Sequence, residues 1–268
     1  MKQAKYIVDT TLRDGEQSPF VNLSWAQKQR IAQRLDEIGV SQIEAGVVAL
    51  SVEEQECICK IIEHRKNADI SVWARMHAGD VSKALECNPQ VVHISIPVSY
   101  LHIYKKLGKN KMWVIRQLQE ILEVVSKGKG QLSVGFEDAS RAELSFLVKI
   151  LNIIESFGDK VKMVRIADTV GGTAPFGHRE LMANLCKQTK IPLEIHGHND
   201  LGLAVPNTLE ALKLGATYAD TTLLGVGERS GNCHFSKFIN LANTNFDFGI
   251  SIEDAKELEE EFRRMIQK

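Results

Sequence analysis

Two polar stretches, far apart in the sequence, each follow an apolar run and carry side chains suited to metal chemistry. The first is Asp9–Gln17, in which Arg13 and Asp14 are neighbours. The second holds His196 and His198. Residues two apart on a strand point the same way, so the two imidazoles would lie on one face. Two histidines and one carboxylate leave coordination positions open, as a catalytic metal site requires.

Each stretch also has a plainer interpretation. Arg13 and Asp14 could belong to a strand end in a solvated turn, and His196 and His198 could be a hydrogen-bonded pair without a metal. One site exists only if the fold brings the two stretches together. Whether a metal site exists therefore depends on where the strands and helices place these two stretches.

Apolar residues alternate between strand and helix spacing along the chain. The expected strands are residues 6–8, 42–46, 70–77, 91–98, 132–136, 163–167, 193–198 and 218–224. Helical patterns separate them; the first, for example, has Ser24 as its cap and Gly39 at its end. Eight strand–helix units predict an α/β fold with a parallel sheet, and eight strands close into a (β/α)8 TIM barrel. A doubly wound open sheet has the same alternation and is the alternative.

The barrel is expected to form one catalytic domain over residues 1–245, because α/β barrels of this size commonly fold as a single unit. Residues 246–268 are expected to form a short C-terminal helical extension. Ser251 can cap its helix, and an apolar stripe follows over residues 255–265. That stripe could pack on the barrel or meet another polypeptide.

In such barrels the active site lies at the carboxyl ends of the strands. The polar residues expected there are Asp14, Glu44, His77, Glu137, Thr169 and His198. The last strand of a closed barrel lies between the seventh and the first, so Asp14 can approach the two histidines. Asn232, in the loop after the last strand, could be a further metal ligand or a donor to one. A helix cap beside a glycine turn is the alternative for Asn232.

The composition is that of an ordinary globular protein, with 268 residues, 44% hydrophobic, 25% charged and a net charge of -1. Nothing in this balance indicates nucleic acid or a membrane as partner. Five dispersed cysteines and the lack of a signal-like segment lead us to expect a cytoplasmic protein. The loop Gly225–Asn232 is not the dinucleotide fingerprint, although it could bind phosphate.

Three motifs resemble one known family. They are DTTLRDGEQ at Asp9–Gln17, HGHNDLGL at His196–Leu203 and GVGERSGN at Gly225–Asn232. The family is that of the metal-dependent, Claisen-condensing barrel enzymes, which includes isopropylmalate, citramalate and homocitrate synthases. Residues 134–141 and 93–99 look most like the nitrogenase-associated homocitrate synthases. The resemblance therefore implies an acyltransferase that condenses acetyl-CoA with 2-oxoglutarate to give homocitrate, in the context of nitrogen fixation.

Some positions depart from related branches. Lysine-pathway homocitrate synthases have an arginine and a serine on strand five, where this chain has Ser133 and Gly135. Either another residue, such as His77 or Arg75, holds the far carboxylate, or the substrate is oxaloacetate, pyruvate or 2-oxoisovalerate. Biotin-dependent relatives have a lysine where this chain has Ala167, and hydroxymethylglutaryl-CoA lyases have a cysteine in the glycine loop. These departures favour the synthase branch.

The resemblance also implies roles for individual residues. A divalent ion, either Mg, Mn, Zn or Fe, would be held by Asp14, His196 and His198, with Asn232 as a further ligand. Arg13 would stabilise the growing alkoxide, and Glu137 would be the base or part of its relay. The residues expected to contact substrate are Arg13, Gln17, Glu44, His77 and Thr169.

The family carries a region after the barrel that covers the active site and supplies further catalytic residues, often to a partner subunit. We expect this chain to lack it, and so to form a homodimer or a complex with a chain that supplies it. The alternative is a partial subunit that binds metal and 2-oxo acid but needs a second polypeptide to turn over. A hydrolytic use of the same metal is a third possibility, which the neighbouring Arg13 fits poorly.

Overall fold

The computed structural model describes residues 2–172 and 175–267, and its centre is a closed barrel of eight parallel strands. The barrel strands are β2 (Tyr6–Asp9), β3 (Gln42–Glu44), β4 (Asp69–Ala74), β5 (Val91–Pro97), β6 (Gln131–Glu137), β7 (Val161–Asp168), β8 (Leu193–Gly197) and β9 (Tyr218–Thr221). The pairing of β9 with β2 closes the ring, so the barrel is confirmed and the open sheet is excluded.

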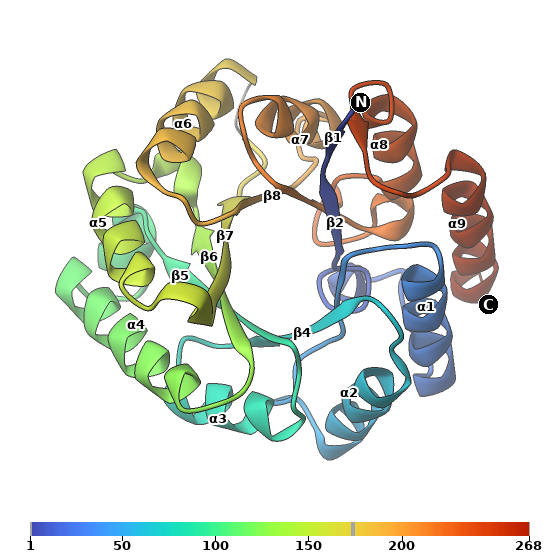
Figure 1. Cartoon of the computed structure of the whole chain (residues 1–268), viewed down its shortest axis with the longest axis horizontal. Helices are drawn as coiled ribbons and strands as arrows, with labels where there is room; N and C mark the ends of the chain where they lie inside the picture. The colour runs from blue at the N-terminus through green and yellow to red at the C-terminus, as the bar shows by residue number, and fades with distance from the viewer. Residues whose placement is uncertain (1, 173–174, 268) are drawn as a thin grey trace.

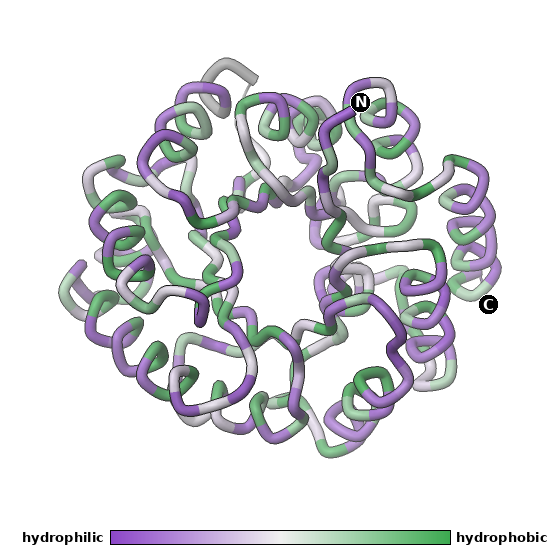
Figure 2. Tube along the Cα trace, viewed as in Figure 1, coloured by the Kyte–Doolittle hydropathy of each residue, from purple (hydrophilic) through white to green (hydrophobic). Residues whose placement is uncertain are grey.

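Helices form a ring outside the strands, as Figure 1 shows. They are α1 (Trp25–Glu37), α2 (Val52–His64), α3 (Ala78–Glu86), α4 (Lys111–Ser126), α5 (Leu144–Glu155), α6 (Pro175–Gln188), α7 (Ala204–Lys213), α8 (Phe235–Ala242) and α9 (Ile252–Ile266). Hydrophobic and hydrophilic residues alternate along them (Figure 2), because one face of each helix is buried against the rest of the protein. Among the described residues, none of these helices has the length and apolarity needed to span a membrane.

Helix α1 shows how local sequence starts these elements. Ser24 accepts a hydrogen bond from the Gln27 backbone N–H, and the Gln27 side chain accepts one from the Ser24 N–H, which completes a capping box. Ile31 and Leu35 are fully buried on the inner face. Gly39 follows the helix with φ +94, a conformation that glycine adopts without strain.

Two strands end three residues earlier in the structure than the apolar pattern predicts. Strand β4 stops at Ala74, because residues 75–77 have no buried apolar side chain to continue the alternation, and His77 instead precedes α3. Strand β9 stops at Thr221, because Leu224 has φ 57 and turns the chain into the glycine-rich loop. The prediction that His77 ends a strand was therefore wrong.

The patterns did not predict a small two-stranded sheet and a π-helix. Strand β1 (Gln3–Ala4) pairs in parallel with β10 (Phe246–Asp247), which ties the start of the chain to the segment before α9. A π-helix at Leu101–Lys106 follows β5. Both depend on pairing or packing that no local sequence period reveals.

Helix α9 packs on its own chain rather than presenting its apolar stripe to another polypeptide. Ala255, Leu258 and Phe262 are fully buried against α1, α8 and the turn after β9. On the outer side, Glu261 pairs with Arg30 at 2.8 Å and with Arg34 at 3.2 Å, both from α1. The last helix therefore closes the ring between α8 and α1 (Figure 1).

Phe262→Ala should destabilise the fold by about 3–5 kcal/mol, because it removes a fully buried ring and leaves a cavity under α9. Urea unfolding followed by circular dichroism measures this change. Lys256→Ala, on the exposed side of the same helix, is the control and should shift the free energy of unfolding by less than about 0.5 kcal/mol. Equal stabilities for the two variants would show that α9 is not docked as described.

Candidate metal centre and active site

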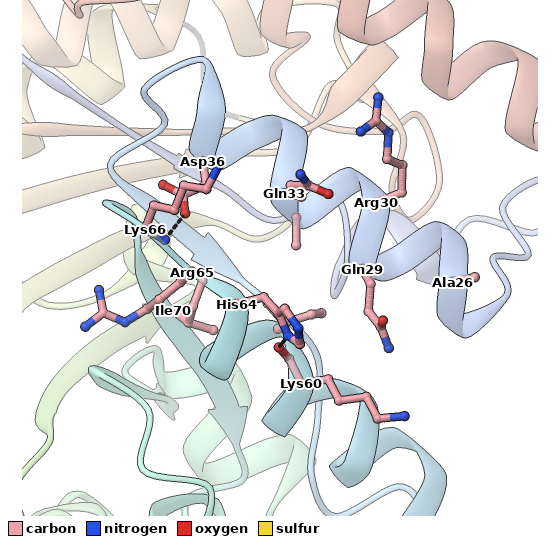
Figure 3. Close-up of a pocket in the computed structure, with 12 residues that line it drawn as sticks. Ala26, Gln29, Arg30, Gln33, Asp36, Lys60, His64, Arg65, Lys66 and Ile70 are labelled. Carbon is pink, nitrogen blue, oxygen red and sulfur yellow. Dashed lines mark hydrogen bonds between the residues drawn. The ribbon is translucent and has the colours of Figure 1, made fainter.

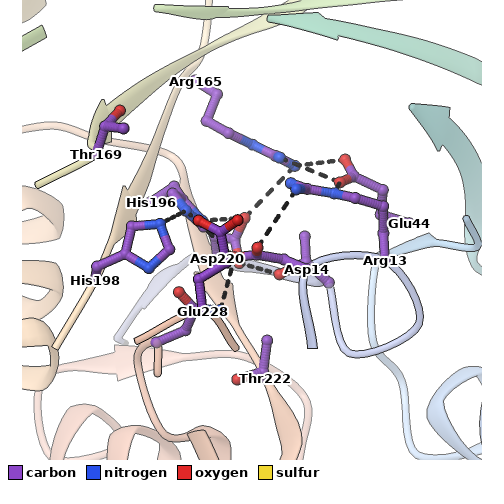
Figure 4. A network of polar contacts seen from close by, with 12 residues as sticks. Arg13, Asp14, Glu44, Arg165, Thr169, His196, His198, Asp220, Thr222 and Glu228 are labelled. Atoms are coloured by element: carbon purple, nitrogen blue, oxygen red, sulfur yellow. Dashed lines mark hydrogen bonds and ion pairs between the residues drawn. The ribbon is translucent and has the colours of Figure 1, made fainter. Parts of the chain in front are cut away.

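Asp14, His196 and His198 converge at the mouth of the barrel (Figure 4), and all three are buried. One ligand atom from each lies within 4.8 Å of the others, and among the described residues no other group of three His, Cys, Asp or Glu side chains does so. The Nε2 atom of His196 is 3.4 Å from Nε2 of His198 and 3.6 Å from Oδ2 of Asp14. The two polar stretches thus form one cluster.

The chemistry of this donor set fits a divalent cation. Burial lowers the pKa of His198 to about 4, so its imidazole is neutral at pH 7 and keeps a lone pair for a metal. Burial opposes the charge on Asp14, but Arg13 and the two histidines hold the pKa of its carboxyl below the usual value. A neutral imidazole and an ionised carboxylate are the forms that bind metal.

Asp220 and Asn232 orient two of the three candidate ligands, His196 and Asp14. Asp220 Oδ2 lies 3.0 Å from His196 Nδ1, so His196 presents its Nε2 to the cluster. Although burial disfavours the charged imidazole, Asp220 raises the pKa of His196 above its ordinary value. Asn232 Nδ2 donates to Asp14 Oδ2 at 2.8 Å and to the Val226 carbonyl at 3.1 Å. Asn232 is therefore placed as a donor to a ligand, and its direct coordination of metal stays a prediction.

Arg165 lies beneath the cluster and is 2% exposed. Its Nη2 is 2.9 Å from Glu44 Oε2 and 3.5 Å from Asp220 Oδ2, and its Nε is 2.8 Å from Glu194 Oε1. Burial disfavours the charge of Glu44, yet the guanidinium groups of Arg165 and Arg13 hold the pKa of its carboxyl well below the usual range. Burial raises the pKa of Glu194. The barrel interior thus holds a linked set of charges that positions Arg13 and His196.

A cavity of about 180 Å³ opens over these groups. It is lined by Arg13, Asp14, Gln17, Trp73, Ser95, Gly135, Glu137, Arg165, Ala167, Thr169, His196, His198 and Glu228. The structure therefore brings most of the expected site residues to one hollow. Glu137 and Thr169 lie at the ends of β6 and β7, across the cavity from Arg13 and Asp14.

Two expected substrate contacts, Glu44 and His77, are placed elsewhere. The Glu44 side chain has no exposed surface and accepts from Arg13 Nε at 2.5 Å, so it positions that arginine from below. The His77 side chain is 70% exposed, lies beside Asp80 and does not line the cavity. Neither is placed to contact a substrate in this cavity.

Several residues of the site were not predicted from the sequence. Arg165 and Asp220 are charged residues inside strands β7 and β9, and that pattern alone could have marked them as partners within the barrel. Trp73 and Ser95 also line the cavity, and Trp73 Nε1 donates to Ser95 Oγ at 3.2 Å. These two carried no signal beyond their position on expected strands.

The glycine-rich loop needs its glycines for close backbone approach. Gly231 has φ +83, and a Cβ there would lie 2.0 Å from the Gly225 carbonyl oxygen. A Cβ at Gly227 would lie 2.3 Å from Asn232 Nδ2. The Gly231 carbonyl also accepts from Asn199 N–H at 2.8 Å, which joins this loop to the end of β8. The loop is therefore built to hold Asn232 beside Asp14.

A larger hollow of about 390 Å³ lies outside the barrel, between α1 and α2 (Figure 3). It is lined by residues such as Arg30, Lys60 and His64. Its carboxylate, Asp36, already accepts backbone N–H bonds from Asn67 and Ala68 at 2.9 and 2.8 Å. The described part of this groove brings no set of metal ligands together, so the barrel mouth is the candidate site.

Comparison with known proteins identifies the family. The model of the HMGL-like family matches residues 4–260. The chain belongs to the HMGL-like family. The homocitrate synthase subunit alpha of Clostridium pasteurianum is 41% identical over 267 residues, which cover 97% of each chain. These findings confirm the prediction of a homocitrate synthase-like enzyme.

Two further similar proteins show how far the similarity extends. The homocitrate synthase of Frankia alni is 42% identical over 84% of this chain, which spans 63% of the length of that relative. A crystal structure of hydroxymethylglutaryl-CoA lyase from Pseudomonas aeruginosa superposes with a TM-score of 0.87, covering 100% of this chain and 95% of the lyase. At 17% identity, the lyase supports the fold alone.

Asp220→Asn should weaken the affinity for Mn²⁺ by about 10- to 100-fold, because the carboxylate that orients His196 is lost while all three candidate ligands stay in place. Isothermal titration calorimetry measures the affinity. Asp159→Asn, in an exposed turn before β7, is the control and should bind as tightly as the unaltered chain. Equal affinities for both variants would refute the role given to Asp220.

Proposed function

We propose that this enzyme condenses acetyl-CoA with a 2-oxo acid, most favourably 2-oxoglutarate, to give homocitrate. The observation that carries the proposal is the placement of Arg13 beside the Asp14, His196 and His198 cluster, on the wall of one cavity. The names of the Clostridium and Frankia relatives support the choice of product. A bound divalent cation would supply Lewis-acid polarisation of the ketone.

Arg13 would stabilise the negative charge that grows on the ketone oxygen. Its guanidinium is held by Glu44 at Nε and lies 3.5 Å from Asp14 Oδ1 at Nη1. Because this orientation exists before substrate arrives, the cation need not reorganise when the alkoxide forms. A lysine could not make the same fixed pair of contacts.

Thr169 and Glu137 would act from the opposite wall. The Thr169 Oγ1 atom accepts the Asp138 backbone N–H at 2.9 Å, which leaves its hydroxyl hydrogen for a substrate carboxylate. Glu137 would take a proton from the methyl group of the thioester, as a general base. Hydrolysis of the thioester after the condensation would make the reaction irreversible.

The far end of the 2-oxo acid would lie toward Ser95 and Gly135. Ser95 Oγ accepts from Trp73 Nε1, so its hydroxyl hydrogen can donate to a polar substrate group. A Cβ at Gly135 would lie 2.8 Å from His93 Nε2 and 3.3 Å from Ser95 Oγ, so glycine keeps this end open. A second carboxylate suits a site with these donors better than a branched apolar chain does.

The purified chain with Mn²⁺ should release free thiol from acetyl-CoA in the presence of 2-oxoglutarate. Oxaloacetate, pyruvate and 2-oxoisovalerate, tested in parallel, should react more slowly. His196→Ala should abolish thiol release, because it removes a candidate metal ligand. His64→Ala, at an exposed position of α2, is the control and should leave thiol release intact. Faster release with another acid would replace 2-oxoglutarate as the proposed substrate.

The alternative function is that of a subunit that binds metal and 2-oxo acid but needs a second polypeptide to turn over. Two observations support a partner. The Clostridium relative, which matches over 97% of both chains, is named as a subunit. Phe20, Leu50, Tyr100 and Leu201 are 57–82% exposed, and all lie in segments that follow barrel strands at the mouth. The partner would be a second copy of this chain or a chain that covers the mouth.

Light scattering of the purified chain should give twice the mass of one chain if the partner is a second copy. Replacing the exposed Phe20 and Leu50 together by serine should then halve that mass, because their apolar surface would return to water. A monomer that binds 2-oxo acid in calorimetry but releases no thiol with any acid would instead favour the separate covering chain. An active monomer would contradict both forms of the partner proposal.

A further inference from the structure

The π-helix Leu101–Lys106 places a histidine beside the active-site cavity. Such helices are rare and occur frequently at functional sites. The start of this helix is held by Ser99, because His102 N–H donates to Ser99 Oγ at 3.1 Å and Ile103 N–H donates to the Ser99 carbonyl at 3.0 Å. Ser99 in turn bridges to Ala142 after β6, and Ile103 is fully buried. His102 is therefore held in a defined position.

The imidazole of His102 lies between two carboxylates. Its Nδ1 atom is 3.8 Å from Glu137 Oε2, and its Nε2 atom is 3.9 Å from Asp138 Oδ2. The side chain is 14% exposed, and within the described part of the chain its buried Nδ1 makes no hydrogen bond. A buried ring nitrogen without a hydrogen bond costs free energy, so its persistence next to a cavity residue needs an explanation.

Asp138 is anchored on its far side. It is fully buried, adopts the left-handed conformation with φ 61, and accepts from Arg141 Nε at 2.7 Å and Nη2 at 2.8 Å. The contacts therefore run in order from Arg141 through Asp138 and His102 to Glu137, which lines the cavity. A base whose neighbour is oriented by a fixed third group is a recurring arrangement in catalysis.

We propose that His102 is a positioning residue, which acts on the reaction only through Glu137. Glu137 removes a proton from the acetyl group, and His102 receives that proton. This inference rests on the proposed condensation. In the step, the methyl C–H bond breaks, its electron pair stays on carbon as the enolate, and the proton goes to a Glu137 carboxylate oxygen. It then passes to His102 Nδ1, and the charge of the imidazolium is balanced by Asp138 at Nε2. Glu137 is thereby returned to its ionised form, and the proton leaves His102 to water.

His102→Gln tests this role in the full chain with Mn²⁺, acetyl-CoA and the preferred 2-oxo acid. We expect kcat to fall about 100-fold, with unchanged binding of the 2-oxo acid in calorimetry. The isotope effect with methyl-deuterated acetyl-CoA should rise, because proton removal becomes slower than the later steps, and added imidazole should restore part of the rate. A role in packing alone would change neither the isotope effect nor the response to imidazole.

His64→Gln, at an exposed histidine on α2, is the matched control and should behave as the unaltered chain does. Wild-type kcat and isotope effect in His102→Gln would overturn the proposal. If circular dichroism shows that His102→Gln is unfolded, His102→Asn takes its place with the same expected results.

A further measurement distinguishes failure of the condensation from failure of the proton relay, which is the transfer of the proton from Glu137 to His102. If the unaltered chain releases no thiol with any acid, deuterium uptake into the methyl group of acetyl-CoA is measured in D2O, with Mn²⁺ and an unreactive 2-hydroxy acid. Uptake that falls at least tenfold in His102→Gln would support the relay without the condensation. Equal uptake in both proteins, or none in either, would overturn it.

Discussion

The pairing of β9 with β2 is the constraint on which the rest of this structure depends. Four residue pairs join the two strands, from Tyr6 with Tyr218 to Asp9 with Thr221. Thr10 continues the contact, since its N–H donates to the Thr221 carbonyl and its hydroxyl donates to Asp220. Closure places the segment after β2 beside the ends of β8 and β9. Without it, Asp14 would have no route to His196 and His198, which are more than 180 residues away in the sequence.

Closure also has an electrostatic consequence. TIM barrels fill their interior mainly with branched apolar side chains, whereas this one holds Arg165 among Glu44, Glu194 and Asp220. Taking single charges out of water would be costly, and here each charge faces an opposite one. The pairing keeps Arg13 and His196 oriented, because Glu44 holds the first and Asp220 the second. Burying these charges is unfavourable for stability, but their pairing holds Arg13 and His196 in position before a substrate binds.

The loops at the mouth complete the arrangement. The glycine-rich loop is joined to β8 through Asn199 and carries Asn232 to Asp14. It is also held from behind, because Glu259 of α9 accepts from the Leu224 and Ser236 N–H groups at 2.9 and 3.0 Å. The last helix therefore does more than cover apolar surface. It holds the glycine-rich loop, and this loop places Asn232 against Asp14 in the candidate metal centre.

The sequence by itself determined the eightfold alternation and the convergence of Asp14 with the two histidines. Those follow from local periods and from the rule that parallel strands end on one face. Only the tertiary structure decided which charges meet inside the barrel, that Glu44 lies below Arg13, and that His77 lies outside the cavity. The physical reason is that strand register, strand ends and the π-helix around His102 depend on packing between segments distant in sequence. A local pattern predicts which face of a strand or helix carries a side chain. Closure of the barrel then determines which residue that side chain contacts across the barrel.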